Sequence, residues 1–269
     1  MRFVNTLRAT GLLFLCLLAA NIFAQQDSTA LEKPFRFSFG FTGGLAFPGK
    51  DFVKGKNPSI PTEFARESGI RVGAYGAWYV SKTIGIQAEV SVFSFQFDEN
   101  AFAERLTSES GPGYLLSERG LFPTFDPVSL LVGPTYKVVA GNWLFTPHLL
   151  LGSFHLPATE INYLLKIQNS HQIIEGSIST EDTWGFTWQP GIEVGYALIK
   201  KQKLMGLLTT RLSYAQSSFT TTFNKNERTF ISEEVTQQAY QQDQMFQSWM
   251  LTFGYSFHID GMLPSAFRK

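Results

Sequence analysis

The stretch Trp249–Ile259, W-M-L-T-F-G-Y-S-F-H-I, alternates large apolar residues with small or polar ones at a period of two. This alternation is typical of a β-strand whose two faces meet different surroundings. A strand of a soluble β-sandwich shows the same pattern, so the stretch decides the fold only if the rest of the chain repeats it. The apolar face carries Trp249, Leu251, Phe253, Tyr255, Phe257 and Ile259.

Seven further stretches repeat the pattern, and their connections are sorted by length. Connections of a few residues alternate with long ones at about 48–69, 98–127, 159–183 and 217–248, as in up-and-down membrane barrels. We therefore predict an all-β fold, an eight-stranded antiparallel up-and-down transmembrane β-barrel with long extracellular loops and short periplasmic turns. Residues 249–259 would close it against residues 35–45. The other predicted strands cover residues 35–42, 70–80, 84–92, 128–138, 143–152, 184–198 and 204–214.

The N-terminus has the features of a secretory signal peptide. Arg2 and Arg8 precede an apolar run, and Ala24 supplies a small residue at the expected cleavage site. We therefore divide the chain into a signal peptide (1–24), a periplasmic N-terminal segment (25–34), an outer-membrane barrel (35–259) and a periplasmic C-terminal tail (260–269). Cys16 is the single cysteine and falls within the signal peptide, so we expect no disulfide and no thiol ligand in the mature chain.

Composition limits the class of protein further. The sequence holds 22 Lys+Arg and 22 Asp+Glu, so no basic excess points to nucleic acid. After residue 24 no apolar run reaches the ~18 residues that a membrane helix needs, so any crossing must use strands. Aromatic residues make up 15% of the chain, which suits a barrel wall that presents them to lipid.

The inward faces of the predicted strands carry several charges. A barrel of eight strands encloses only enough space for its own side chains, so charges inside it must pair. We expect a salt-bridge network that plugs the barrel, and the alternative is a gated pore through the same residues. The predicted network comprises Arg36, Arg71, Glu89, Lys137, Glu193 and Arg211, with Gln87, Gln189, His148 and His258 nearby.

Four tryptophans sort to the strand ends. Trp78 and Trp143 lie near the short turns, and Trp184 and Trp249 lie near the long connections. Two aromatic girdles, one at each membrane interface, would have this distribution.

The end of the last strand carries a family resemblance. Thr252, Gly254, Phe257 and Ile259 occupy the polar, glycine, aromatic and hydrophobic positions of a sequence similar to the β-signal of outer-membrane barrels. The mature chain resembles the small eight-stranded OmpA/OmpX-like barrels. The F-A-Q cleavage site and phenylalanine-rich strands resemble the PorT-like outer-membrane β-barrel proteins of the Bacteroidota. Such barrels often end at the last aromatic of the signal, so the tail leaves open whether the signal is read internally or the tail docks to a partner.

The long connections have distinct features. The strand phase blurs at Phe93, Phe95 and Phe97, which suggests a bulge or the membrane exit. Residues 99–106 suggest a short helix. Two stretches suggest hairpins that continue the barrel strands, with turns at 168–170 and 224–227. Open edges of such a projecting sheet can capture partner strands, whereas the alternative is a passive rim.

We predict an integral protein of a Gram-negative outer membrane with a structural, adhesion or docking role through its loops or periplasmic side. The alternative that the PorT-like resemblance implies is a narrow channel or an accessory component of secretion or uptake. A third hypothesis is a lipid-modifying enzyme using His155 near Ser153. We expect no cofactor and no metal. The expected partners are outer-membrane lipid and lipopolysaccharide, the barrel assembly machinery and an unknown protein.

Overall fold

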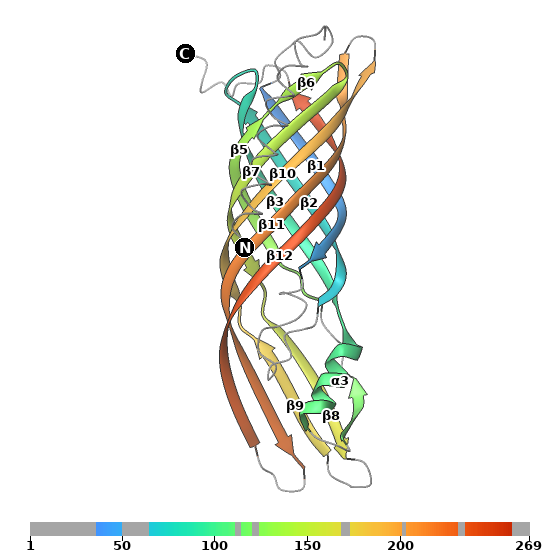
Figure 1. The fold of residues 1–269 in the computed structure, drawn as a ribbon, viewed down its shortest axis with the longest axis vertical. Coiled ribbons are helices and arrows are strands. Elements are labelled where there is room, and N and C mark those ends of the chain that lie inside the picture. Colours follow the sequence, from blue (N-terminus) through green and yellow to red (C-terminus); the bar gives the residue numbers. More distant parts are fainter. Residues whose placement is uncertain are drawn as a thin grey trace, which may run out of the picture.

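Eight antiparallel strands form a closed ring (Figure 1). The computed structural model describes residues 36–49, 65–110, 114–119, 124–167, 173–200, 203–230 and 235–259, so the predicted segments 1–24, 25–34 and 260–269 lie outside it. Around the ring the order is β10-β7-β5-β3-β2-β1-β12-β11, and pairing of β10 with β11 closes it. The strands are β1 (Phe37–Pro48), β2 (Ala65–Tyr79), β3 (Ile84–Phe97), β5 (Val128–Tyr136), β7 (Trp143–Leu156), β10 (Thr183–Lys200), β11 (Lys203–Thr229) and β12 (Val235–Ile259).

The predicted pairing of the first and last strands is confirmed. β1 and β12 pair in one register from Phe37↔Ile259 to Pro48↔Ser248. At the opposite side of the ring a short strand, β6 (Val138–Ala140), follows β5 and pairs with the start of β7 through a turn at Gly141. Gly141 has φ of 60°, a conformation that glycine adopts without steric cost. We call the end of the ring that holds this turn and the turn at residues 80–83 the turn end.

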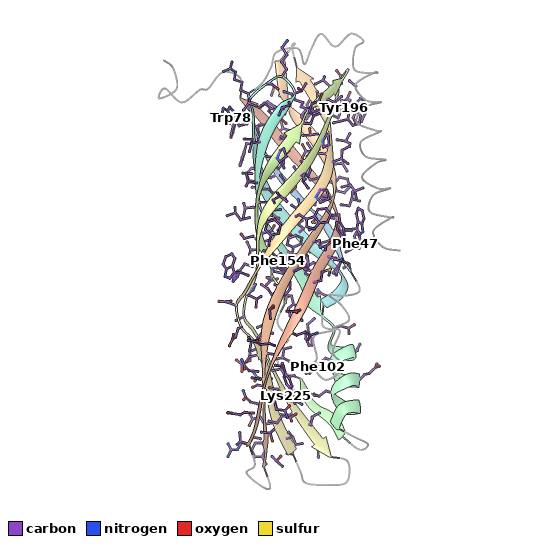
Figure 2. All side chains as sticks on the ribbon, turned by 60° about the vertical axis from the view of Figure 1, so that its left-hand side comes forward. Phe47, Trp78, Phe102, Phe154, Tyr196 and Lys225 are labelled. Atoms are coloured by element: carbon purple, nitrogen blue, oxygen red, sulfur yellow. The ribbon has the colours of Figure 1, made fainter. Side chains whose placement is uncertain are left out.

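The strands of the ring have an apolar outer face and a mixed inner face. On β3 the side chains alternate without a break between buried inward positions and outward positions that are exposed or half-buried. Figure 2 shows Trp78 and Tyr196 near the turn end and Phe47 towards the other end. Large exposed apolar side chains around the ring include Phe41, Ile70, Val72, Ile86, Val92, Leu130, Val132, Phe186, Leu208, Leu212, Trp249 and Phe253.

The interior of the ring changes character along its length. An apolar layer near the turn end includes Tyr79, Leu144 and Leu207. Polar and charged residues follow it, and a second apolar layer lies beyond them. We call this second group the aromatic layer; it comprises Phe93, Phe95, Phe154, Phe219 and Phe246, together with smaller apolar residues and Phe125.

Beyond the aromatic layer, β11 and β12 continue outward as part of a sheet that projects from the ring (Figure 1). This projecting sheet has the order β12-β11-β9-β8-β4. It includes residues 220–229 of β11 and 235–245 of β12, with β4 (Tyr114–Arg119), β8 (Thr159–Ile167) and β9 (Ile173–Thr180). The predicted helix is confirmed as α3 (Glu99–Ser110), whose Phe102 and Leu106 pack with Phe97, Ile161, Tyr163, Leu165 and Ile178.

Two predictions for the connections were wrong, namely the turn at 224–227 and a bulge in β3 at Phe93, Phe95 and Phe97, whereas the membrane exit, the other interpretation of that stretch, stays a prediction. β11 continues through residues 224–227 without a turn, because these residues pair with β12 on one side and with β9 on the other. β3 keeps its phase at Phe93, Phe95 and Phe97, which all point inward. The register shift at this level lies in β2, between Ala65 and Gly69. The predicted turn at 168–170 lies outside the described residues, but its flanking strands pair as expected up to Lys166↔Ile173.

No helix among the described residues is long and apolar enough to cross a membrane.

Candidate functional site

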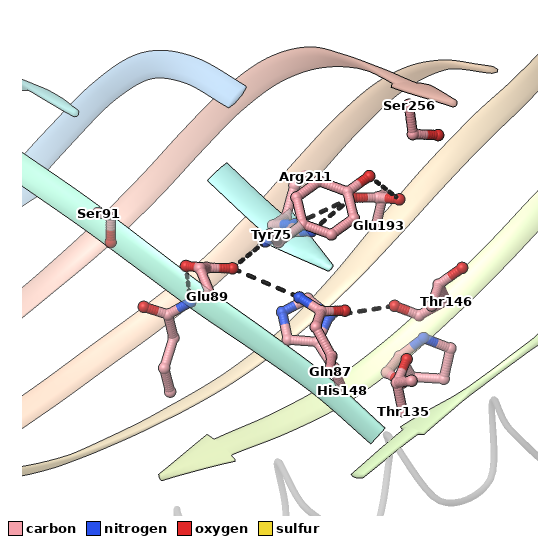
Figure 3. Close-up of polar contacts among 12 residues, drawn as sticks. Tyr75, Gln87, Glu89, Ser91, Thr135, Thr146, His148, Glu193, Arg211 and Ser256 are labelled. Carbon is pink, nitrogen blue, oxygen red and sulfur yellow. Dashed lines mark hydrogen bonds and ion pairs between the residues drawn. The ribbon is translucent and has the colours of Figure 1, made fainter. Parts of the chain in front are cut away.

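The most distinctive site is a group of buried charges in the middle of the ring, contributed by four different strands. Arg71 lies on β2, Glu89 on β3, Glu193 on β10 and Arg211 on β11. Glu193 and Arg211 stand directly opposite each other in the β10–β11 ladder. All four side chains point inward because each occupies an inward position in its strand's alternation. Figure 3 shows Glu89, Arg211, Glu193 and Tyr75 converging in the interior.

Glu89 is the central acceptor of this network. One of its carboxylate oxygens pairs with Arg71 Nη2 and the other pairs with Arg211 Nη1. The amide of Gln189 donates to Glu89 Oε1 over 3.0 Å, and the amide of Gln87 donates to Oε2 over 3.4 Å. The side chains of Glu89, Arg71 and Arg211 are at most 1% exposed. Glu89 is therefore held by donors from three other strands as well as its own.

Glu193 is the second carboxylate of the network. Its Oε2 accepts hydrogen bonds from Arg211 Nη2 at 2.6 Å and Nε at 3.1 Å. The hydroxyl of Tyr75 donates to Oε1 over 2.9 Å, and the Arg211 guanidinium lies 4.3 Å from the centre of the Tyr75 ring. Gly40 makes room for this ring, since a Cβ there would lie 2.7 Å from it. The Tyr75 hydroxyl therefore satisfies a carboxylate oxygen of Glu193, and the Tyr75 ring covers the guanidinium of Arg211.

The charges of this network balance. Two guanidinium groups face two carboxylates, and each carboxylate has at least one charged partner. An isolated buried ion would cost several kcal/mol, whereas hydrogen-bonded pairs offset much of that cost. The arrangement therefore holds four strands of the ring in one relative position.

Two of the predicted network residues lie elsewhere. Lys137 is buried, but its ammonium lies over the Tyr79 ring at 4.2 Å, in the layer near the turn end. Arg36 lies outside the network: it immediately precedes β1 and its side chain is exposed. Alternation alone assigned Arg36 an inward position, but at the start of the strand the side chain reaches solvent.

Several buried polar atoms near the network have no hydrogen-bonding partner among the described residues. They include Arg71 Nε and Nη1, Ser213 Oγ and Thr252 Oγ1. Thr252 stands opposite Arg211 in the β11–β12 ladder. On the other side of the network, Ser91 accepts from Arg71 over 3.2 Å and lies 2.8 Å from Ser129 Oγ. The polar surroundings of the network are therefore satisfied more fully on β3 and β5 than on β12.

The aromatic layer covers the network on the side of the projecting sheet. Phe154 stacks with Phe246 at 4.6 Å and with Phe219 at 5.6 Å. Phe93 packs edge to face with Phe246, and the Arg71 guanidinium lies 5.8 Å from the Phe93 ring. Side chains therefore occupy the interior at three successive levels: the layer at the turn end, the charge network and the aromatic layer.

Sequence reasoning did not identify Tyr75 or Ser129 as members of this site. Tyr75 occupies a buried position of β2, and nothing in its spacing indicated a contact with Glu193, more than a hundred positions away. Ser129 joins Ser91 because β3 and β5 pair with these two residues opposite each other. Both contacts depend on strand register, which alternation does not specify.

The four predicted girdle tryptophans lie on the outer wall. Trp78, Trp143, Trp184 and Trp249 are all exposed. Trp143 contacts Tyr196 and Trp249 contacts Tyr214, with ring centres 4.9 and 5.0 Å apart. At the end of β12, Thr252 is buried and Phe257 is exposed, whereas Gly254 lies against the backbone of β1, where a Cβ would meet Phe41 O at 2.1 Å. Ile259 pairs with Phe37.

His155, the candidate for an enzymatic role, lies on the outer wall beside the projecting sheet. Its ring stacks on Trp184 with centres 4.3 Å apart, and its Nε2 lies 3.6 Å from Asp182 Oδ1. Asp182 in turn accepts from the Ala158 amide over 2.7 Å. These contacts hold the histidine against an aromatic ring and give it no hydrogen bond to Ser153 among the described residues.

No protein-family model matches the chain, and no curated protein matches it. Among solved structures, a major outer membrane protein from Thermus thermophilus is 14% identical, with a TM-score of 0.45, over 82% of this chain and 99% of that chain. The outer membrane protein OprG from Pseudomonas aeruginosa is 13% identical, with a TM-score of 0.40, over 84% of this chain and 98% of that chain. AlkL in lipid bilayers is 14% identical, with a TM-score of 0.35, over 88% of this chain and 97% of that chain. All three are outer-membrane proteins.

Proposed function

We propose that this protein is an integral outer-membrane β-barrel with a closed interior, which acts outside the cell through its projecting sheet in adhesion or docking. The change in the outer face along β12 carries the proposal. Trp249, Phe253 and Phe257 are exposed apolar side chains, whereas Gln241 and Asp243 are exposed polar ones further along the same face. A strand that leaves lipid for water would show this change.

The height of the apolar part fits a bilayer. Eight residue steps separate Trp249 from Phe257, which correspond to about 27 Å along the strand. With a strand tilt of about 40°, this gives a band about 20 Å tall, close to the ~25 Å of outer-membrane barrels. In this orientation the turn end is periplasmic and the projecting sheet is extracellular. Trp78 and Trp143 then mark one interface, and Trp184 and Trp249 mark the other.

The packed interior supports a role that does not depend on transport. Arg71 and Arg211 are bound by carboxylates in the middle of the ring, and Phe95 and Phe154 are fully buried above them. Passage of a solute would require the salt bridges to break and the aromatic layer to separate. Of the residues that the structure describes, those of the projecting sheet remain available to a partner.

This proposal also implies partners during assembly. We propose that Thr252, Gly254, Phe257 and Ile259 act as the β-signal for the barrel assembly machinery, and that the outer wall contacts lipid and lipopolysaccharide. The position of the four residues on β12, the strand that pairs with β1, supports the first of these proposals, and the exposed apolar side chains of the ring support the second.

Cell fractionation and protease digestion test the proposal together. We expect the protein in the outer-membrane fraction, with heat-modifiable gel mobility, and a protease applied to intact cells should cut the projecting sheet while leaving the ring intact. In planar bilayers the purified protein should show no steady conductance. Recovery in the soluble fraction, or stable ion conductance of the unmodified protein, would contradict the proposal.

A narrow channel is the second candidate, favoured by the polar atoms without protein partners among the described residues at Arg71, Ser213 and Thr252. Such atoms could line a narrow water path beside the network. A Glu193→Gln, Arg211→Met variant separates the two candidates. Conductance that rises while the fold is retained would favour the channel, and loss of stability without conductance would favour the closed interior.

A further inference from the structure

The projecting sheet has two edges with different structures. One edge is β4, which is short, shows a register shift in its pairing with β8, and lies beside α3 (Figure 1). Short strands, bulges and covering helices are the usual means by which proteins protect a sheet edge from other strands. The β4 edge is therefore protected.

The other edge is formed by β12. β1 accompanies β12 as far as Pro48↔Ser248, and the Gly49 amide then donates to Gln247 O over 2.6 Å. Beyond this point no described strand lies on that side of Val235–Met245. On its other side the same segment pairs with β11 in unbroken register. We call Val235–Met245 the β12 edge.

Within the described part of the chain, the β12 edge lacks the usual protection. Its sequence, V-T-Q-Q-A-Y-Q-Q-D-Q-M, contains no proline, glycine, lysine or arginine. Most of its side chains are exposed, and no register shift interrupts its ladder with β11. A long, regular, nearly uncharged edge is a ready template for another strand.

We propose that the β12 edge pairs antiparallel with the same edge of a second copy of this chain. The inference rests on the proposed function, because it requires the projecting sheet to lie outside the membrane. The partner of the projecting sheet would be the projecting sheet of a second copy. The position of β1 supports the proposal, because β1 already pairs antiparallel with β12 as far as Ser248. An antiparallel strand added at the β12 edge would lie on the same side of β12, in line with β1.

The hydrogen-bonding pattern of β12 fixes the register. Since Gln247 O faces the β1 side and alternate residues face the same way, the odd-numbered residues from 235 to 245 direct their N–H and C=O groups to the free edge. Two identical antiparallel strands satisfy all of these groups when the two Tyr240 residues stand opposite each other. The opposed pairs are then Val235 with Met245, Thr236 with Gln244, Gln237 with Asp243, Gln238 with Gln242, and Ala239 with Gln241.

This register is chemically compatible. Asp243, the single charged residue of the edge, faces the amide of Gln237 and not its own copy. In the other opposed pairs, Val235 meets Met245 and Tyr240 meets its own copy. The glutamine amides meet a second amide, the Thr236 hydroxyl or the Ala239 methyl group. Directly opposed like charges would destabilise a sheet, and none occurs here.

The pairing also fixes how the two rings are oriented. The two β12 strands run in opposite directions, so the two rings lie at opposite ends of the assembly. This geometry suits copies in two membranes that face each other. Nine residue steps from Tyr240 to Trp249 give about 30 Å along the strand, or about 23 Å in height at a 40° tilt. Val235 lies only five steps beyond Tyr240, so the tip of one sheet stops short of the opposite membrane.

Cysteine cross-linking tests the register. In the full chain with Cys16→Ser, Tyr240→Cys should form a disulfide between two copies, because residues opposed in a non-hydrogen-bonded pair lie about 4.5 Å apart at Cα. Gln244→Cys is the matched control on the same face. Its copies would lie about 27 Å apart, so it should form no disulfide.

Charge substitutions test self-pairing in membranes. Vesicles carrying the unmodified protein, with the projecting sheet shown by protease to face outward, should cluster. Vesicles with Ala239→Lys, Gln241→Lys should stay dispersed, and so should vesicles with Ala239→Glu, Gln241→Glu, since each places like charges opposite one another. A mixture of the two variants should cluster again.

Insertion is measured separately by heat-modifiable mobility. If the unmodified protein inserts but its vesicles stay dispersed, the inference is overturned and the proposed function remains intact. If the protein does not insert, both are overturned. Failure of the mixed variants to cluster would also overturn the inference. So would a Tyr240→Cys thiol that is shielded from a maleimide in dilute monomer, because the edge would then be covered by the chain itself.

Discussion

Replacing Glu89 with glutamine should destabilise the protein more than any other isosteric change in the ring. Glu89 is the only carboxylate bound to Arg71 among the described residues, whereas Arg211 also binds Glu193. The variant leaves the Arg71 charge buried without a counter-ion. Breaking a buried pair in this way costs about 3–5 kcal/mol, and we expect a loss of that size in the free energy of unfolding.

The free energy can be measured by reversible urea unfolding in detergent micelles or vesicles, followed by tryptophan fluorescence and by heat-modifiable gel mobility. Glu181→Gln is the matched control, because its side chain is exposed, and it should change stability by less than about 0.5 kcal/mol. A second variant, Arg71→Met with Glu89→Gln, removes both charges and keeps the Arg211–Glu193 pair. It should recover to within about 2 kcal/mol of the unmodified protein. A loss below about 1 kcal/mol for Glu89→Gln alone would refute the buried-network interpretation.

Three further changes test other parts of the structure. Phe253→Arg, on the outer face midway along the apolar band, should cost about 2–4 kcal/mol in vesicle unfolding, whereas Asn226→Arg on the projecting sheet should be nearly neutral; equal effects would argue against a lipid-facing wall. Phe154→Ala should cost about 3–5 kcal/mol, measured in the same way, because it leaves a cavity in the aromatic layer. Gly176→Ala would place a Cβ 2.2 Å from the Tyr163 ring and so strain the pairing of β8 with β9. Amide hydrogen exchange should therefore become faster in β8 and β9 and stay unchanged in the ring. An equal increase in both parts would show that they unfold as one unit.

Alternation in the sequence was sufficient to predict the strands of the ring and their outward faces. It also assigned Arg71, Glu89, Glu193 and Arg211 to the interior. It did not indicate which carboxylate meets which guanidinium, because that depends on the stagger between strands. Nor did it indicate where an inward position opens to solvent, as at Arg36.

The two wrong predictions, a bulge in β3 and a turn at residues 224–227, have different physical causes. Phe93, Phe95 and Phe97 obscured the phase of β3 because the apolar residues of the strand change faces after Val92. Beyond this residue the inward positions carry phenylalanines and the outward positions carry Ser94 and Gln96, while the strand itself continues in phase. The N-K-N-E sequence at residues 224–227 has a turn-forming composition, but pairing with strands on both sides keeps it extended. Tertiary contacts therefore overrode local preference at residues 224–227.

The long ladder between β11 and β12 has a consequence for the order in which the protein folds. These two strands are adjacent in sequence and pair from Arg228↔Val235 to Leu207↔Ser256, so this hairpin brings together residues separated by a short loop. The β1–β12 pairing joins Phe37 to Ile259, the most distant pairing in sequence. Because closing a longer loop costs more chain entropy, we expect the C-terminal hairpin to form early and the seam between β1 and β12 to close last. Until then the seam would expose the whole of β1 and much of β12 as open edges, and assembly would depend on a factor that shields them.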